Sequence, residues 1–328
     1  MSKVYFTDMR TSFTENLPKK LTRLIDRAGL GTIDFDHKFV AIKIHFGEMG
    51  NLAYLRPQYA RALAAYIKER GGLPFLTDCN TLYVGSRKNA LEHIETAYIN
   101  GYTPYATGCQ VIIADGVRGT DEAYIPIGCA EVKTAKIGRA IADADIIISL
   151  NHFKGHEDAG FGGALKNLGM GSGSRAGKME IDHDNCVGCG RCIAICSFDA
   201  IKPHSSSSEA SLNRRIAEYA YAVVKDKPNF HISIAADISP NCDCHPENDA
   251  PIVPNIGMFA SFDPVAIDLA AADAVNAMPA NPRSALSEAE CRCHDHFINV
   301  HPNTNWRVQI EHGEEIGLGS SEYELIRI

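Results

Sequence analysis

Apolar and polar residues follow two different periods along the chain. Continuous apolar runs, typical of strands buried on both faces, occur at Phe39–Phe46, Leu73–Asp78, Gln110–Asp115, Asp145–His152, 229–237 and 256–263. Between these runs, apolar residues recur at helical spacing over 56–72, 86–100, 137–144, 205–226 and 263–278. This alternation predicts an α/β domain in which a mostly parallel sheet lies between two layers of helices.

Residues suited to helix ends support these boundaries. Gly71 and Gly72 follow the first helical segment, at a position where glycine often ends a helix. Asp263 precedes Pro264, and an N-cap followed by proline in the first turn predicts a helix start. Ser206 with Glu209 predicts a capping box.

Polar side chains follow the carboxyl ends of the predicted strands. Because ligands of open α/β sheets bind beyond those ends, we expect the side chains to converge at one edge. They are His45, Glu48, Asp78, Asn80, Asp115, Arg118, Asn151, His152, Lys154, His156, Asp237 and Asp263. Each of these residues taken alone could be an ordinary polar loop residue, so the prediction of a site depends on all of them together.

Four cysteines have the spacing C-x2-C-x2-C-x3-C. They are Cys186, Cys189, Cys192 and Cys196. This spacing lets a tight loop aim successive thiolates at neighbouring irons, as in bacterial ferredoxins, and it predicts a [4Fe–4S] cluster. A serine run at 205–208 marks the exit from this stretch. We therefore expect a ferredoxin-type insertion at 178–205 within a discontinuous α/β domain formed by 1–177 and 206–328.

Two further cysteine pairs leave the number of metal centres open. Cys242 and Cys244 stand in the sequence NCDCH, and Cys291 and Cys293 stand in CRCHDH. With the first four they make eight, the number that two [4Fe–4S] clusters require. Either Cys196 closes the first cluster, or it joins Cys242 and Cys244 on a second one. A zinc site of Cys242, Cys244 and nearby histidines is the third alternative. The second and third alternatives both make Cys242 and Cys244 metal ligands.

The segment Ser149–Lys178 is rich in glycine and locally basic, although the whole chain has a net charge of −8. Glycines let backbone N–H groups approach an anion, and a helix beginning near Gly163 would direct its N-terminus at it. We predict a pocket for a phosphate or carboxylate group, with a solvated hinge as the alternative. The predicted ligand-binding residues are His152, Lys154, His156, Lys166, Asn167 and, from an earlier loop, Arg56.

Composition excludes some classes of function. The chain has 328 residues, of which 45% are hydrophobic and 22% charged, so it can build a core. An acidic chain does not suit non-specific binding of nucleic acid, and no apolar run approaches the roughly 20 residues that span a membrane. The start, MSKVYFTDMR, resembles no export signal. We expect a cytoplasmic protein whose 11 cysteines are thiols or metal ligands.

Several long stretches together resemble a known family. They are KIHFGEMGNLAYLRP, FLTDCNTLYVGSR, VIIADGVRG, NHFKGHEDAGFGGALKNLGMG, the ferredoxin-type run, and NCDCH followed by PIVPNIGMFASFDPVAID. The chain resembles the bacterial and archaeal family of uncharacterised Fe–S centre proteins, in which a ferredoxin-type segment interrupts a domain of unknown function. The resemblance covers nearly the whole chain and implies a [4Fe–4S] protein, commonly from anaerobes. Ser197 departs from the proline that usually follows the fourth cysteine.

The sequence favours an oxidoreductase or electron-transfer component. The cluster would pass single electrons to an anionic small molecule at the sheet edge, with a redox partner such as ferredoxin. His45, Glu48, Asp78 and Asp115 would position or protonate that molecule, and His45 with Glu48 could alternatively bind a metal. Two alternatives stay open: a lyase or transferase that uses the cluster as Lewis acid or sulfur donor, and a redox sensor without turnover.

Overall fold

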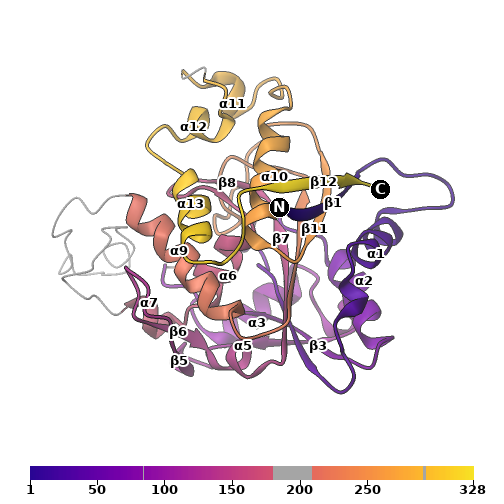
Figure 1. The fold of residues 1–328 in the computed structure, drawn as a ribbon, viewed down its shortest axis with the longest axis vertical. Coiled ribbons are helices and arrows are strands. Elements are labelled where there is room, and N and C mark those ends of the chain that lie inside the picture. Colours follow the sequence, from indigo (N-terminus) through magenta and orange to yellow (C-terminus); the bar gives the residue numbers. More distant parts are fainter. Residues whose placement is uncertain (84, 180–208, 291–292) are drawn as a thin grey trace.

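The computed structural model describes residues 1–83, 85–179, 209–290 and 293–328, and its centre is an eight-stranded sheet (Figure 1). Residues 180–205 of the predicted segment 178–205, including its four cysteines, therefore lie outside the described residues. Ser206 lies outside them as well, so the predicted capping box of Ser206 and Glu209 cannot be described. In sheet order the strands are β12 (Tyr323–Arg327), β1 (Ser2–Asp8), β11 (Gly257–Ser261), β10 (Asn229–Ala235), β7 (Ile146–His152), β2 (Phe39–Lys43), β3 (Leu73–Asp78) and β4 (Gln110–Ile113).

The sheet is mostly parallel, as the sequence predicts. Strands β10, β7, β2, β3 and β4 are mutually parallel, and β12 is parallel to β1. Strand β11 runs antiparallel to both of its neighbours. Its carboxyl end therefore points away from the other strand ends, so the expectation that Asp263 joins their edge is wrong. Asp263 instead caps a helix, as its sequence context predicts, by accepting hydrogen bonds from Val265 N and Ala266 N.

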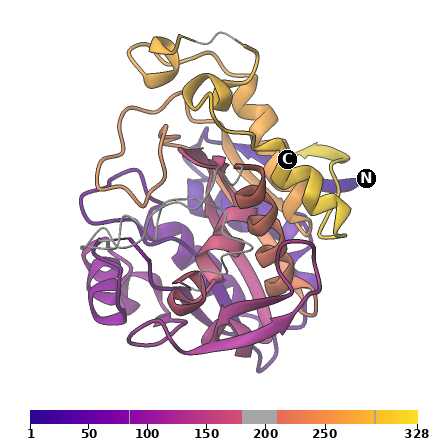
Figure 2. The same cartoon turned by 90° about the vertical axis from the view of Figure 1, so that its left-hand side faces the viewer.

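Helices cover both faces of the sheet (Figures 1 and 2). One face packs against α1 (Leu17–Arg27), α2 (Pro57–Lys68), α3 (Ala90–Ile99) and α4 (Pro104–Thr107). The other packs against α6 (Ala164–Ser172), α9 (Glu209–Val224), α10 (Pro264–Asn276) and α13 (Arg307–Glu315). The buried apolar side chains form one cluster on each side, which is the three-layer arrangement that the alternating pattern predicts.

Shorter elements surround these layers. They are η1 (Leu30–Thr32), α5 (Arg139–Asp143), α7 (Arg175–Met179), α11 (Ala285–Glu288), α12 (His296–Val300), and the two hairpins formed by β5 (Glu122–Pro126) with β6 (Thr134–Gly138) and by β8 (Lys154–His156) with β9 (Gly160–Gly162).

Helix α6 lies unusually close to its neighbour α9. A Cβ atom at Gly169 would stand only 2.2 Å from the carbonyl oxygen of Ile216, so only glycine permits this approach. The close contact fixes α6 beside the carboxyl ends of β2 and β7. The functional residues of the glycine-rich segment are therefore presented at that edge.

Candidate functional site

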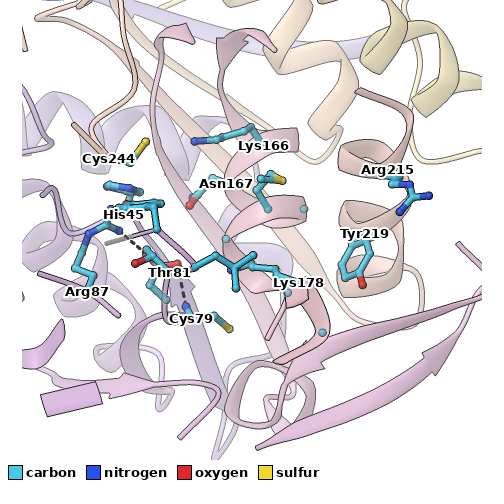
Figure 3. Close-up of a pocket in the computed structure, with 18 of the residues that line it drawn as sticks. His45, Cys79, Thr81, Arg87, Lys166, Asn167, Lys178, Arg215, Tyr219 and Cys244 are labelled. Atoms are coloured by element: carbon cyan, nitrogen blue, oxygen red, sulfur yellow. Dashed lines mark hydrogen bonds and ion pairs between the residues drawn. The ribbon is translucent and has the colours of Figure 1, made fainter. Parts of the chain in front are cut away.

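A pocket of about 200 Å³ opens beside α6 at the carboxyl ends of β2, β3 and β7 (Figure 3). His45, Arg87 and Cys244 stand on one side of α6, and Arg215 and Tyr219 of α9 stand on the other. The remaining side chains that line it and carry polar groups or sulfur include Asp78, Cys79, Thr81, Tyr83, His152, Lys154, Lys166, Asn167, Met170 and Lys178. Basic groups outnumber acidic ones on this surface, so the pocket suits an anion.

A buried ionic network supports the floor of the pocket. Lys43 Nζ lies 2.9 Å from Asp78 Oδ1 and donates to Asn167 Oδ1 at 2.7 Å. Arg87 joins this network, with Nη1 at 3.6 Å from Asp78 Oδ2 and Nε at 3.2 Å from Glu48 Oε2. Burial by itself would raise the pKa of Asp78, but Lys43, His93 and Arg87 outweigh it and hold the pKa below its ordinary value. The network thus keeps Asp78 ionised and rigid.

His45 is oriented as a neutral hydrogen-bond donor. Its Nδ1 accepts the backbone N–H of Gly47 at 3.0 Å, so the proton of the neutral ring resides on Nε2. Burial and the neighbouring Arg87 keep the pKa of His45 well below its ordinary value. Because His45 lines the pocket, a bound oxyanion can accept its Nε2–H.

The residues at the end of β7 and just after it contact the loop that contains Ala236 and Asp243. His152 Nδ1 lies 2.9 Å from Asp243 Oδ1, and its Nε2 lies 2.8 Å from the carbonyl oxygen of Ala236. Lys154 Nζ lies 3.7 Å from Asp243 Oδ2. All three side chains are buried. Both ring nitrogens of His152 thus hold this loop in place, and the residue also lines the pocket.

Cys242 and Cys244 stand next to each other with contrasting properties. Lys166 Nζ lies 2.8 Å from Cys242 Sγ. A hydrogen bond from the Cys244 thiol, together with Lys166, Lys154 and His156, holds the pKa of Cys242 well below its ordinary value despite its burial. The same pairing with Cys242 raises the pKa of Cys244 well above its ordinary value. Cys244 is therefore the donor and Cys242 the acceptor of this hydrogen bond, and of the two only Cys244 lines the pocket.

The N-terminus of α6 is engaged by the protein itself. The helix begins at Ala164, next to the predicted position, but Ala164 N and Leu165 N donate to the two carboxylate oxygens of Asp268 at 2.7 and 2.8 Å. These N–H groups are satisfied within the protein, so the expectation that the α6 N-terminus would face a bound anion is wrong. The side chains of His45, Lys154 and Lys166 do line the pocket.

The structure gathers most, but not all, of the predicted residues. His45, Asp78, His152, Lys154, Lys166 and Asn167 line the pocket. Glu48 lies behind it in the ionic network, and His156 lies beneath it against Cys242. Asp115 is buried as an acceptor for Asn80 N and Arg175 N. Arg56 is 72% exposed in its side chain and stands 3.7 Å from Asp237, outside the pocket lining.

Several lining residues escape the sequence argument. Tyr83 and Arg87 follow β3 in a loop with no motif, although Arg87 is part of the family-like stretch FLTDCNTLYVGSR. Lys178, Arg215 and Tyr219 flank the cysteine-rich segment on its two sides. Arg215 and Tyr219 are four residues apart on α9, and helical spacing alone could have placed them on one face.

Comparisons with known proteins give a family match. A family model described as a domain of unknown function, DUF362, matches residues 40–273. The comparison with curated proteins found no match. Among the described residues, no helix is both long enough and apolar enough to cross a membrane.

Two solved structures are similar at low identity. One is the lactate racemase apoprotein from Thermoanaerobacterium thermosaccharolyticum, with 12% identity, a TM-score of 0.48, and coverage of 72% of this chain and 51% of that chain. The other is a protein from Thermotoga maritima, with 14% identity, a TM-score of 0.39, and coverage of 66% and 49%. This chain thus spans about half the length of each.

Proposed function

The chain belongs to the DUF362 family, whose domain has no known function, and we propose that it is an iron–sulfur protein of electron transfer or redox catalysis. Its ligand would be an anionic small molecule in the pocket beside α6, and its partner a small redox protein such as ferredoxin. One observation carries the proposal: Lys178 and Arg215, which flank the four-cysteine segment in sequence, both line the basic pocket.

Cofactor and ligand would accordingly be close. Lys178 and Arg215 stand on the two sides of this segment in the sequence, so we expect a cluster held by Cys186, Cys189, Cys192 and Cys196 to lie near the ligand. The bound cluster would supply electrons one at a time. The four cysteines lie outside the described residues, so their ligation rests on their spacing.

The chain's own residues would bind and orient the anion. Lys154 and Lys166 supply positive charge that the neighbouring Asp243 and Cys242 already fix in place. His45 supplies an Nε2–H donor to an oxygen of the ligand. Asp78 does not act on the ligand directly in this proposal, since Lys43 and Arg87 surround its carboxylate; it holds the floor in one geometry.

Oxygen-free purification tests the cofactor. We expect about four irons and four sulfides per chain and an EPR signal after dithionite, both lost on Cys189→Ser. Cys129→Ser is the matched control, because Cys129 is a half-buried thiol away from the pocket lining, and it should retain the iron. A colourless wild-type protein without iron would refute the proposal.

Binding of anions tests the pocket separately. In a thermal-shift series with phosphate and small carboxylates, the stabilising anion should bind Lys166→Met at least tenfold more weakly than wild type. Lys68→Met, at an exposed helical site, should bind it normally. A reducible cluster together with unchanged anion binding and electron transfer in Lys154→Met and His45→Ala would instead favour the sensor.

A further inference from the structure

The loop that carries Cys242 and Cys244 is packed unusually tightly against β8. Gly155 N donates to the carbonyl oxygen of Ser239 at 2.9 Å, and a Cβ at Gly155 would lie 1.9 Å from the carbonyl oxygen of Pro240. His301 Nε2 also contacts Pro240 O, at 2.8 Å. Residues 239–245, which we call the cysteine loop, are thereby fixed beside the sequence His156-Glu157.

Three metal-ligating side chains meet at this junction, and a fourth, Cys242, lies next to one of them. A ligand atom from each of Glu157, Cys244 and His245 lies within 4.8 Å of the other two. Glu157 Oε1 is already 3.0 Å from His245 Nε2. Cys242 Sγ is within hydrogen-bonding reach of Cys244 Sγ. The four donors thus come from two chain segments that the Gly155 contact holds together.

One oxygen at the junction lacks a hydrogen bond, although His156 Nδ1 lies 3.7 Å from it. Glu157 Oε2 is buried and accepts no hydrogen bond from the described residues. A buried carboxylate oxygen without a donor is unfavourable, so native proteins rarely leave one in place. A bound cation at the junction would satisfy it.

We propose that this junction is a mononuclear site for a transition-metal ion of the zinc class. Its ligands are Cys242, Cys244, His245 and Glu157. Two sulfurs, one imidazole and one carboxylate are a donor set that suits Zn²⁺, with bonds of about 2.0–2.3 Å. Such bonds place tetrahedral ligand atoms roughly 3.3–3.8 Å apart. The ligand atoms of Glu157, Cys244 and His245 already lie within 4.8 Å of one another, and Cys242 Sγ would have to turn from its contact with Lys166 to join them.

His156 supports this site without being a ligand. Its Nδ1 accepts the backbone N–H groups of Asp158 and Ala159, at 3.1 and 3.2 Å. The ring proton therefore resides on Nε2, which is buried and faces Cys242. His156 and Lys166 would donate to the Cys242 sulfur from outside the coordination shell, as groups behind zinc ligands commonly do.

The charges at the junction also balance. Two thiolates and one carboxylate bring three negative charges to a divalent ion, which leaves a net charge of −1. Lys166 at 2.8 Å from Cys242 offsets that charge. Four protein ligands close the coordination shell, so the ion would fix the cysteine loop and with it Cys244 at the pocket wall.

This site goes beyond the proposed function, because the iron–sulfur proposal uses the cysteines of 186–196. A [4Fe–4S] cluster takes four thiolates. Among the described residues, only two thiols reach the junction, beside nitrogen and oxygen donors. The structure therefore favours zinc over a second cluster for Cys242 and Cys244.

Elemental analysis of the full chain tests the site. Wild type purified from zinc-supplemented medium should contain one zinc per chain, and Cys189→Ser should keep that zinc while losing its iron. Zinc without iron would refute the iron–sulfur proposal alone, and iron without zinc would refute this site alone.

Co²⁺ binding to metal-stripped Cys189→Ser protein identifies the ligands. The wild-type junction should give the intense visible bands and sulfur-to-cobalt charge transfer of tetrahedral thiolate coordination, at one equivalent. Adding Cys244→Ser, or Glu157→Gln, which preserves side-chain volume, should weaken Co²⁺ binding at least tenfold. Adding His37→Ala, at an exposed histidine, should change nothing. Unchanged affinity in both ligand variants, or a spectrum without charge transfer, would overturn the assignment.

Discussion

Lys43 Nζ lies 2.9 Å from Asp78 Oδ1, and both side chains are almost completely buried beneath the pocket. The pair joins the carboxyl ends of two neighbouring strands, β2 and β3. A Cβ at Gly171 would stand 2.4 Å from the same Nζ, so α6 leaves just enough room for the ammonium group. The pair is therefore part of the framework that shapes the pocket floor.

Lys43→Met should destabilise the protein strongly. Removing one partner of a buried ion pair leaves the other charge uncompensated, which costs about 3–5 kcal/mol in the free energy of unfolding. Arg87, 3.6 Å from Asp78, would still compensate part of the Asp78 charge and so reduce this loss of stability. Urea denaturation measures the loss. Arg23→Met, which removes the partly exposed pair with Glu15, should cost about 1 kcal/mol or less. Equal losses in the two variants would contradict the role of Lys43.

Asp268 should make the protein less stable as pH rises. Burial raises the pKa of Asp268 from 3.8 to about 7, against the two N–H groups of α6 that favour the carboxylate. Between these values the folded state binds more protons than the unfolded state, so stability is complete below pH 3.8 and declines up to about pH 7. The slope from this group is about 1.4 kcal/mol per pH unit.

Asp268→Asn should remove that slope. The variant loses one of two acceptors, which gives an offset of about 1 kcal/mol that does not depend on pH. Unfolding free energies at several pH values between 4 and 8 measure the effect. Asp226→Asn, at an exposed site, should keep the wild-type pH dependence. A parallel pair of curves for wild type and Asp268→Asn would show that Asp268 does not titrate in this range.

His231 should have the opposite effect. It is buried on β10 between Ser149 Oγ and Asn229 Oδ1, each at 2.9 Å, and burial lowers its pKa from 6.5 to about 3. The unfolded state then binds more protons, so this contribution is present above pH 6.5 and is lost as pH falls towards 3.

His231→Gln should therefore remove a contribution of about 1.4 kcal/mol per pH unit and leave the opposing slope of Asp268. Because Asp268 and His231 have opposite slopes between about pH 4 and 6.5, wild type should depend on pH less than either variant does. His37→Gln, at an exposed histidine, is the control and should follow wild type. A His231→Gln curve that runs parallel to that of wild type between about pH 4 and 6.5 would contradict the prediction.

Local pattern was sufficient for the central strands but not for the outer ones. Leu73–Asp78 is a strand with the predicted bounds, because a short, mostly apolar run that follows Gly71 and Gly72 has few other solutions. Strands β1 and β12 were not predicted. They are far apart in the sequence and pair with each other in parallel, and β12, with the sequence YELIR, shows neither a continuous apolar run nor strict alternation. Such pairing has no signal within a short window.

The site shows the same division. Strand-end position predicted His45, Asp78, His152 and Lys154, because parallel strands bring their carboxyl ends together. The contact between Lys166 and Cys242 joins residues 76 positions apart, and no local spacing indicates it. The engagement of the α6 N-terminus by Asp268 is equally distant in sequence, 104 positions from Ala164.

Gly155 links the fold to the proposed metal site, and its substitution tests that link. In Gly155→Ala, the new methyl group would lie 1.9 Å from Pro240 O, so the cysteine loop must move away from β8 and the hydrogen bond to Ser239 O is lost. We expect a loss of about 1–3 kcal/mol in stability. We also expect at least tenfold weaker Co²⁺ binding in the metal-stripped protein, because Cys242 moves away from Glu157.

Gly317→Ala is the matched control: its Cβ meets open space, but its φ of +74° costs about 1–2 kcal/mol. That variant should lose similar stability and bind Co²⁺ normally. Equal Co²⁺ affinity in the two variants would show that the approach of the cysteine loop to β8 does not build the site.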